Sequence, residues 1–391
     1  FAELLAYLGM GQSPRGALHI FFTRGWVFFS MGMFSSYVMY LCSQPAKGEF
    51  TVVTCLGLGL EIFYCWQHGG IGSGLGCAAL LALFLNALAT DGKAGQLFLQ
   101  RFLSALVPPF FILLTPTFLD ATVKLNPSTL DHFAYAYDRC LGGQLSFFLA
   151  RLFAQVFWFE KASMFFYVTL PLAWALVYVS GLNKRGAIAL RVFHSFIISA
   201  VIANIVFHLF PCGGPKNFFG TLFPNTLPVV EALVSQVMSA LTPRNAVPSL
   251  HTTWVLLLWW NSRSQSLKTR TVTYLYLAFT LFATLGLGEH YLFDLIVAIP
   301  FAVSVQALCF YELPLTDNRR SRPLVVGILL FFLGLLFARF GLASVEPCSS
   351  LVWLVTLVLV LIPLYLESRL WQAAEEFGGM ISPASTVVSN Q

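Results

Sequence analysis

The sequence predicts an all-α fold, a polytopic transmembrane helical bundle. Of its 391 residues, 58% are hydrophobic and only 10% are charged, and the mean hydropathy is +0.77. Soluble domains carry about a quarter charged residues, so this composition excludes an ordinary soluble protein. The net charge of +5 is modest and forms no basic stripe, so no nucleic-acid partner is expected.

Apolar runs recur along the chain, and a helix needs about twenty such residues to cross a bilayer. The shorter runs are also compatible with re-entrant segments. Hydropathy predicts roughly eleven spans, at residues 25–41, 50–66, 75–89, 102–119, 163–182, 188–210, 251–260 with its flanks, 274–285, 291–311, 324–340 and 351–366.

The segment between Leu119 and Ser163 has the pattern of helices that lie on the membrane surface rather than cross it. Asp131, Tyr135 and Asp138 recur at helical spacing, and a Phe-rich run follows them. This pattern favours a pair of interfacial amphipathic helices on the outer leaflet, in front of the candidate site. An ordinary connecting loop with a solvated polar face is the alternative.

Basic residues in the short connections predict the orientation. Two spans separate each cluster from the next, so all three fall on one face, which the positive-inside rule makes cytoplasmic. The intervening connections, 211–250 and 286–290, then face the periplasm, the lumen or the exterior. The three clusters are Lys184, Arg185 and Arg191, then Arg263, Lys268 and Arg270, then Arg319, Arg320 and Arg322.

Two short polar motifs stand just ahead of apolar runs on that outer side: Pro248-Ser249-Leu250-His251 and the stretch from His290 to Asp294. Asp294 lies one helical turn beyond His290, so its carboxylate can hold one ring nitrogen and leave the other free to react. His251 is then suited to proton transfer. This combination is typical of nucleophilic catalysis that needs no metal, and no cofactor is expected.

These motifs resemble those of a known family. Pro-Ser-x-His followed by His-x-x-x-Asp is similar to the second and third signature motifs of the type-2 phosphatidic acid phosphatase superfamily, over roughly residues 130–311. The first motif of that family is Lys, six residues, then Arg-Pro; here Lys216 is followed at the same spacing by Phe223-Pro224. The third motif normally opens with Ser-Arg, where this chain has Ala283-Thr284.

The loss of both arginines resembles the inositol-phosphorylceramide synthase and sphingomyelin synthase branch of the superfamily. The resemblance implies a core of six helices in which His290 attacks phosphorus and forms a phosphohistidine. Asp294 would fix the tautomer of His290. His251 would protonate the leaving oxygen and then deprotonate the incoming water or alcohol.

Five further residues are expected to bind the substrate. Backbone N–H groups at Gly214 and Ser249 are placed to contact phosphoryl oxygens, with Asn245 beside them. Lys216 and Arg244 are the nearest cations in the sequence. Because two arginines are missing, a singly charged phosphodiester fits better than a doubly charged monoester. If Arg244 replaces a missing arginine, that distinction is lost.

The predicted function is an integral membrane lipid phosphotransferase, acting at the non-cytoplasmic face. It would move a phospho-headgroup from a phospholipid donor to a lipid, polyol or sugar acceptor. A phosphatase acting on a phosphatidic-acid-like or polyprenyl (di)phosphate substrate is the first alternative. A membrane transporter is the second, although the polar residues gather at one face and no inverted repeat is evident. An inactive scaffold of the same fold is less compatible with the intact His, His, Asp set.

The chain divides into four regions by this interpretation. Residues 1–120 hold N-terminal transmembrane helices of unknown role, and residues 121–312 hold the catalytic core with its interfacial helix. Residues 313–370 form a C-terminal transmembrane hairpin, and residues 371–391 are expected to be a disordered cytoplasmic tail. The sequence leaves the acceptor and the oligomeric state open.

Overall fold

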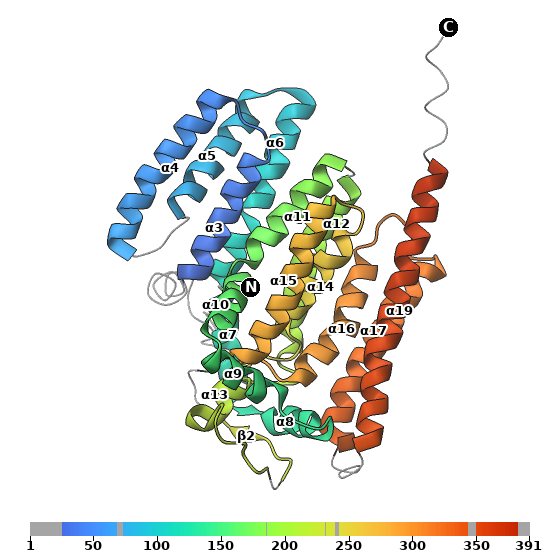
Figure 1. Cartoon of the computed structure of the whole chain (residues 1–391). Coiled ribbons are helices and arrows are strands. Elements are labelled where there is room, and N and C mark those ends of the chain that lie inside the picture. Colours follow the sequence, from blue (N-terminus) through green and yellow to red (C-terminus); the bar gives the residue numbers. More distant parts are fainter. Residues whose placement is uncertain are drawn as a thin grey trace.

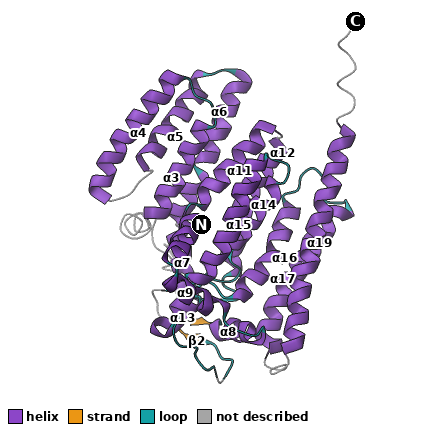
Figure 2. Cartoon of the chain, viewed as in Figure 1, coloured by secondary structure: helices purple, strands orange, loops and turns teal. Residues whose placement is uncertain are grey.

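The computed structural model describes residues 26–68, 73–184, 186–230, 232–238, 242–342 and 349–381. Within these residues the fold is almost entirely helical, as the sequence predicts (Figure 2). The strands of this part are short: β1 (Ser128–Thr129) pairs antiparallel with β2 (Gln236–Val237).

The helices before β1 form a group beside the rest of the bundle, drawn in blue and cyan in Figure 1. Contacts of α3 with α11, and of α10 with α3, join this group to the following helices. Its members are α3 (Trp26–Leu41), α4 (Lys47–His68), α5 (Ser73–Ala89), α6 (Gly92–Ala105) and α7 (Val107–Leu125).

The helices after β1 carry both motifs. A single-turn helix (Gly220–Leu222) follows α13, and a π-helical turn (Phe337–Gly341) follows α17. These helices are α8 (Asp131–Cys140), α9 (Leu145–Gln155), α10 (Phe157–Val168), α11 (Leu170–Lys184), α12 (Gly186–Val206), α13 (Pro215–Phe219), α14 (Leu250–Ser262), α15 (Leu267–Gly286), α16 (Leu292–Leu308), α17 (Asn318–Leu336) and α19 (Ser349–Ile381).

Local sequence signals account for where several of these helices begin. The hydroxyl oxygens of Ser249 and Ser266 accept hydrogen bonds from the backbone N–H three residues on, and so cap α14 and α15. Asp317 caps α17 by accepting from the N–H of Arg319. Such side chains satisfy N–H groups that have no partner within the helix.

The number of membrane spans differs from the prediction. By length and composition, the described residues contain four helices able to cross a membrane: Gly92–Leu125, Ala187–Val206, Asn318–Gly341 and Ser350–Ala373. A fifth is added if the bent pair Phe157–Val168 and Leu170–Leu182 is one span. The predicted eleven spans and the six-helix core are therefore not confirmed. Several predicted spans form apolar helices of only 10–17 residues, shorter than the twenty or so that a full crossing needs.

The predicted disordered tail is wrong for residues 371–381, because α19 continues to Ile381. Trp371 is largely buried and its ring packs edge-on against Phe310, while its Nε1 donates to Glu375 at 2.8 Å. These contacts fix the helix near the end of the candidate span Ser350–Ala373. Residues 382–391 lie outside the described part.

The predicted interfacial segment is a helix pair, α8 and α9, rather than a loop. Phe148 on α9 is 57% exposed, as expected for a surface helix. On α8, however, Asp131 and Asp138 are fully buried rather than solvated. These two acids face inward because the Gly213-Gly214 loop and the start of α16 pack onto them.

Apolar packing joins the motif-bearing helices into one core. A large cluster of buried side chains links α8, α12, α14, α16, α17 and α19, and a second links the N-terminal helices to α11, α14 and α15. In Figure 1, α8, α13 and β2 lie at the lower end of the bundle, and the α14–α15 and α16–α17 connections lie at the upper end. The motif loops and the basic connections are thus at opposite ends.

Arg320 secures the basic end of α16. Its guanidinium donates to the carbonyl oxygens of Ala307 and Leu308 at 2.9 and 2.7 Å, and also to that of Leu313. The side chain is only 5% exposed. Arg320 therefore supplies donors to helix-end carbonyls that have no partner within α16.

We expect Arg320→Met to lower the free energy of unfolding by about 2 kcal/mol, because the carbonyl groups of Leu308 and Leu313 lose the donor that Arg320 supplies. Thermal unfolding in detergent measures the change. Arg322→Met is the matched control, since this substitution removes the same charge from an exposed position on the same helix. Equal shifts for the two variants would contradict the role given to Arg320.

Candidate active site

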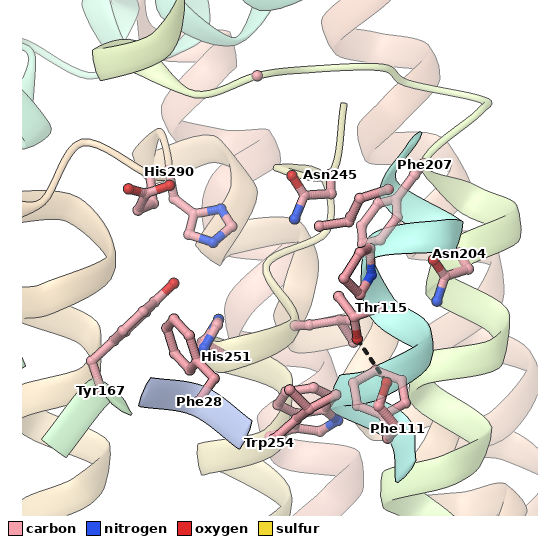
Figure 3. A pocket seen from close by; sticks show the side chains of 16 residues that line it. Phe28, Phe111, Thr115, Tyr167, Asn204, Phe207, Asn245, His251, Trp254 and His290 are labelled. Carbon is pink, nitrogen blue, oxygen red and sulfur yellow. Dashed lines mark hydrogen bonds between the residues drawn. The ribbon is translucent and has the colours of Figure 1, made fainter. Parts of the chain in front are cut away.

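A cavity of about 340 Å³ lies where the two motif loops meet the N-terminal helices. His251, His290 and Asn245 of the predicted set line it, as Figure 3 shows, and so does Gly213. Most of the remaining lining is apolar or aromatic. These lining residues are Phe28, Phe111, Ile112, Thr115, Pro116, Leu119, Tyr167, Asn204, Phe207, Leu250, Trp254 and Glu289.

Among the described residues, the partners of the His290 ring lie at one nitrogen. Its Nδ1 lies 2.9 Å from the carbonyl oxygen of Ala246 and 3.3 Å from Oδ2 of Asp294. A carbonyl oxygen can only accept, so Nδ1 carries the hydrogen in this contact. Nε2 therefore keeps its lone pair, and the ring projects into the cavity (Figure 3). This is the arrangement that a nitrogen nucleophile requires.

The same contacts join the two motifs. Ala246 precedes the Pro248-Ser249 pair, so the bond from His290 connects one loop to the other. The N–H of Ser249 donates to the backbone carbonyl of Asp294 at 3.3 Å. Oδ2 of Asp294 also accepts from the N–H of Tyr291 at 2.9 Å, which caps α16. Asp294 thus orients both the imidazole and the helix start.

Burial lowers the pKa of His290 to about 4, and the nearby Glu289 carboxylate opposes this only in part. The imidazole is 5% exposed, and burial disfavours its charged form. His290 is therefore neutral over the physiological pH range, as a nucleophile must be.

His251 lies in the first turn of α14 and lines the same cavity. Its ring stacks on Tyr167, with the ring centroids 4.0 Å apart, and meets Trp254 at 5.8 Å. Figure 3 shows His251 between these aromatic side chains, across the cavity from His290. The stacking fixes the imidazole plane while leaving its nitrogen edge free to approach a bound group.

Asp131 binds two backbone N–H groups, and one of them, that of Gly214, was predicted to bind phosphate. Its two carboxylate oxygens accept from the N–H groups of Gly213 and Gly214, each at 3.0 Å. The Tyr291 hydroxyl donates to Oδ1 at 3.0 Å. Burial raises the pKa of Asp131 to about 6, and the hydrogen bonds lower it in part. Gly214 is therefore placed as a structural contact rather than as a wall of the cavity.

Asp138, two turns further along α8, caps α16 from outside that helix. Its carboxylate accepts from the N–H groups of Leu292 and Phe293, at 2.8 and 2.9 Å. Burial raises the pKa of Asp138 well above its usual value, against the effect of these two bonds. Asp131 thus fixes the Gly213-Gly214 loop on α8, and Asp138 fixes the His290 loop. The sequence interpretation missed this role because helical spacing of acids also describes a solvated face.

Gly214 also has a steric reason for being glycine. Its φ is +82°, a region that other residues rarely adopt. A Cβ at this position would lie 2.2 Å from the carbonyl oxygen of Glu289. The residue thus allows the first polar loop to approach the His290 loop.

Arg244 does not line the cavity. It is fully buried, and its guanidinium donates to carbonyl oxygens of Asn126 and Met238, each at 3.1 Å, and to that of Thr242. Thr122 accepts from its backbone N–H. These contacts fasten the segment around β1 and β2. The Arg244 guanidinium, which the sequence predicted to bind phosphate, therefore binds the backbone instead.

Lys216 and Ser249 also lie outside the cavity lining. The Lys216 side chain is 59% exposed, and its Nζ lies 3.9 Å from Oε1 of Glu289, which does line the cavity. Lys216 is therefore a rim residue. The Ser249 hydroxyl caps α14 through the N–H and the hydroxyl of Thr252, at 3.3 and 3.0 Å.

The N-terminal helices contribute a wall that the sequence interpretation did not predict. Phe28 of α3 lines the cavity, together with Phe111, Thr115 and Pro116 of α7. The Thr115 hydroxyl donates to the Phe111 carbonyl at 2.9 Å, the bond drawn in Figure 3. Apolar residues distant in sequence carry no motif, so only the packing of α3 and α7 reveals their place.

The site region matches a known family. A family model of the PAP2 superfamily matches residues 133–308, less than half of the 391-residue chain. The matched region contains both motifs, and the match suggests lipid phosphatase or phosphotransferase chemistry. No curated protein and no solved structure matches the chain.

We expect His290 to remain neutral at pH 6. Its pKa of about 4 lies below the value of about 6.5 for an unfolded histidine, so the folded state binds the proton less readily. The stability linked to this group is complete above pH 6.5 and decreases as the pH falls toward 4. NMR titration of ring-labelled histidine in detergent, assigned with His290→Ala, measures the pKa. A midpoint at 6.5 or above would contradict the buried neutral imidazole.

We expect Asp138→Ala to lower the free energy of unfolding by about 1–3 kcal/mol, because two backbone N–H groups lose their acceptor. Asp138→Asn keeps one acceptor oxygen and should fall between wild type and Asp138→Ala. Thermal unfolding measures stability, and the His290 NMR signal reports whether the loop moves.

Asp120→Ala is the control for Asp138, since Asp120 pairs with Lys124 across a partly exposed helix face at 3.0 Å. Such exposed pairs contribute about 0–1 kcal/mol. An Asp138→Ala protein as stable as Asp120→Ala, with an unmoved His290 signal, would show that Asp138 does not hold the loop.

Proposed function

We propose that this protein is an integral membrane lipid phosphotransferase. It moves a phospho-headgroup from a phospholipid donor to a lipid, polyol or sugar acceptor, through a phosphohistidine at His290. The observation that carries the proposal is the one-sided hold on His290: Nδ1 is bound to Ala246 and Asp294, and the ring projects into a cavity shared with His251. The PAP2 match over residues 133–308 supports the same chemistry.

The reaction has two steps. In the first, Nε2 of His290 attacks the phosphorus, the bond from phosphorus to the donor's alcohol oxygen breaks, and protonated His251 gives that oxygen its proton. Burial lowers the pKa of His251, so the negative charge of the bound donor must supply the attraction that keeps this ring protonated. In the second, the acceptor hydroxyl gives its proton to His251 and its oxygen attacks the phosphorus. The phosphorus–nitrogen bond then breaks, and both histidines return to their starting states.

The charge around the cavity supports a singly charged phosphodiester. Among the described residues, no Lys or Arg side chain lines the cavity, whereas the Glu289 carboxylate does. Arg244 is committed to backbone carbonyls, and Lys216 lies at the rim. A phosphate monoester carries close to two negative charges at neutral pH, which this lining does not neutralise.

The apolar walls favour an alcohol acceptor over water. Phe28, Phe111, Trp254 and Tyr167 surround the approach to His251. Such a lining excludes water and accommodates a lipid acceptor. This preference accords with the synthase branch that the motifs resemble. Hydrolysis has the same first step and differs only in the second, so the two reactions share the His290 requirement.

We place the reaction at the non-cytoplasmic face. The motif loops lie at the end of the bundle opposite Arg263 and Arg319, which follow α14 and begin α17 (Figure 1). Basic connections favour the cytoplasmic side. The donor would then reach the site from the outer leaflet.

We expect His290→Ala to reduce turnover about a thousandfold or more, as losing a nucleophile does. His251→Ala should cost about a hundredfold to ten-thousandfold, the usual contribution of an acid–base group. The measurement uses purified protein in nanodiscs of a mixed-lipid extract, with products identified by mass spectrometry. The expected products are a headgroup-free lipid and a newly phospho-decorated acceptor.

His194→Ala is the matched control, because His194 contacts Tyr311, at the basic end of the bundle, away from the cavity. It should retain wild-type turnover. Release of inorganic phosphate from lipid monoesters would replace the transferase proposal with the phosphatase one. If His290→Ala behaves like His194→Ala, the catalytic assignment itself is wrong.

A further inference from the structure

A second cavity adjoins the catalytic one. It has a volume of about 630 Å³ and lies between α7 and α12. Phe111 and Asn204 line both cavities, so these two side chains lie between the two spaces. Any ligand that enters the catalytic cavity from this side passes them.

The second cavity, called the α7–α12 groove below, runs along the direction in which lipid chains lie. On α7 its lining extends from Val107 to Leu125, about 27 Å at the helical rise of about 1.5 Å per residue. Both walls belong to candidate spans, Gly92–Leu125 and Ala187–Val206. The length is close to the hydrocarbon thickness of a bilayer, about 30 Å.

The groove is open toward the lipid and closed toward the protein. Phe110, Val201 and Ile205 on its walls are 60%, 58% and 63% exposed. Ala121, in contrast, is 2% exposed, and its small side chain leaves room above it. A chain can therefore enter sideways from the membrane and rest against the protein.

The polar side chains of the groove lie toward the catalytic cavity, where the lipid headgroup is expected. Asn204 lies at the junction with the catalytic cavity, and its amide donates to the Ala200 carbonyl at 2.8 Å. His208 lies after the end of α12, and its Nδ1 is 2.8 Å from Nδ2 of Asn126. The other lining residues are apolar. The groove thus suits a long hydrocarbon chain whose polar end lies beside His251 and His290.

We propose that the α7–α12 groove binds one hydrocarbon chain of the lipid whose phosphate occupies the catalytic cavity. This inference rests on the proposed function. It assigns chain recognition to α7, which lies outside the family-matched residues 133–308. The N-terminal helices would then select the lipid, while the matched region supplies the reacting groups.

The binding test uses a diacyl phosphatidylcholine with a diazirine on one chain, in phosphatidylcholine nanodiscs. After irradiation, peptide mapping should show label on α7 and α12 that excess unlabelled lipid displaces. Val201→Trp, which fills the groove, should lower that label about fivefold or more. Val325→Trp is the matched control: Val325 is 52% exposed on α17, so the same bulk is added to another apolar surface.

Equal, non-saturable labelling of the α7–α12 and α17 surfaces would overturn the proposal, because that pattern describes bulk lipid. Retention of the groove label in Val201→Trp would also overturn it. Neither readout needs turnover, so the groove can be tested even if the proposed reaction is wrong.

The activity test compares a donor with sixteen-carbon chains and one with six-carbon chains, both with the same headgroup. Val201→Trp should lower kcat/KM for the long-chain donor about tenfold, the effect of withdrawing roughly two methylenes from an apolar site. It should leave the short-chain donor within about twofold of wild type. Equal losses on both donors would refute chain recognition by the groove. If His290→Ala loses activity and Val201→Trp does not, the proposed reaction stands and the groove proposal fails.

Discussion

The hydrogen bonds from α8 to the Gly213-Gly214 loop and to the His290 loop determine the rest of the site. Asp131 holds Gly213 and Gly214, and Asp138 holds the first N–H groups of α16. Both acids are fully buried, where a carboxylate is unfavourable unless donors surround it. Their N–H partners provide that compensation. The His290 loop is thereby anchored at both sides before any substrate arrives, and preorganisation of this kind favours catalysis.

This anchoring also explains how the site uses its cations. Arg244 is fully buried among the carbonyls near β1 and β2, and Arg320 among those at the end of α16. Each guanidinium donates to backbone carbonyls at or beyond the end of a regular element. These two positive charges therefore serve the fold rather than phosphate binding. The proposed phosphodiester substrate, with its single charge, accords with this use of the cations.

The sequence predicted the helical class, the pairing of His290 with Asp294, and the α8–α9 helix pair, because each depends on local spacing. It did not predict the buried state of Asp131 and Asp138, since the same periodicity describes a solvated helix face. It also placed Arg244 near phosphate, although three-dimensional packing turns its side chain toward Asn126. The aromatic wall from α3 and α7 could not be predicted either, because apolar residues of a membrane protein look alike in sequence. The predicted number of spans was not confirmed for a related reason: short buried helices are as apolar as helices that cross the whole membrane.

The division of the cavity between two parts of the chain has an evolutionary consequence. Both histidines, and the acids that hold their loops, lie after residue 130, whereas Phe28 and Phe111 come from the helices before it. Substitutions in α3 and α7 can therefore reshape the entrance without disturbing a single hydrogen bond of the reacting groups. Under the proposed function, lipid preference and chemistry can drift separately. Relatives with similar motifs and different N-terminal helices would then share a reaction but not a substrate.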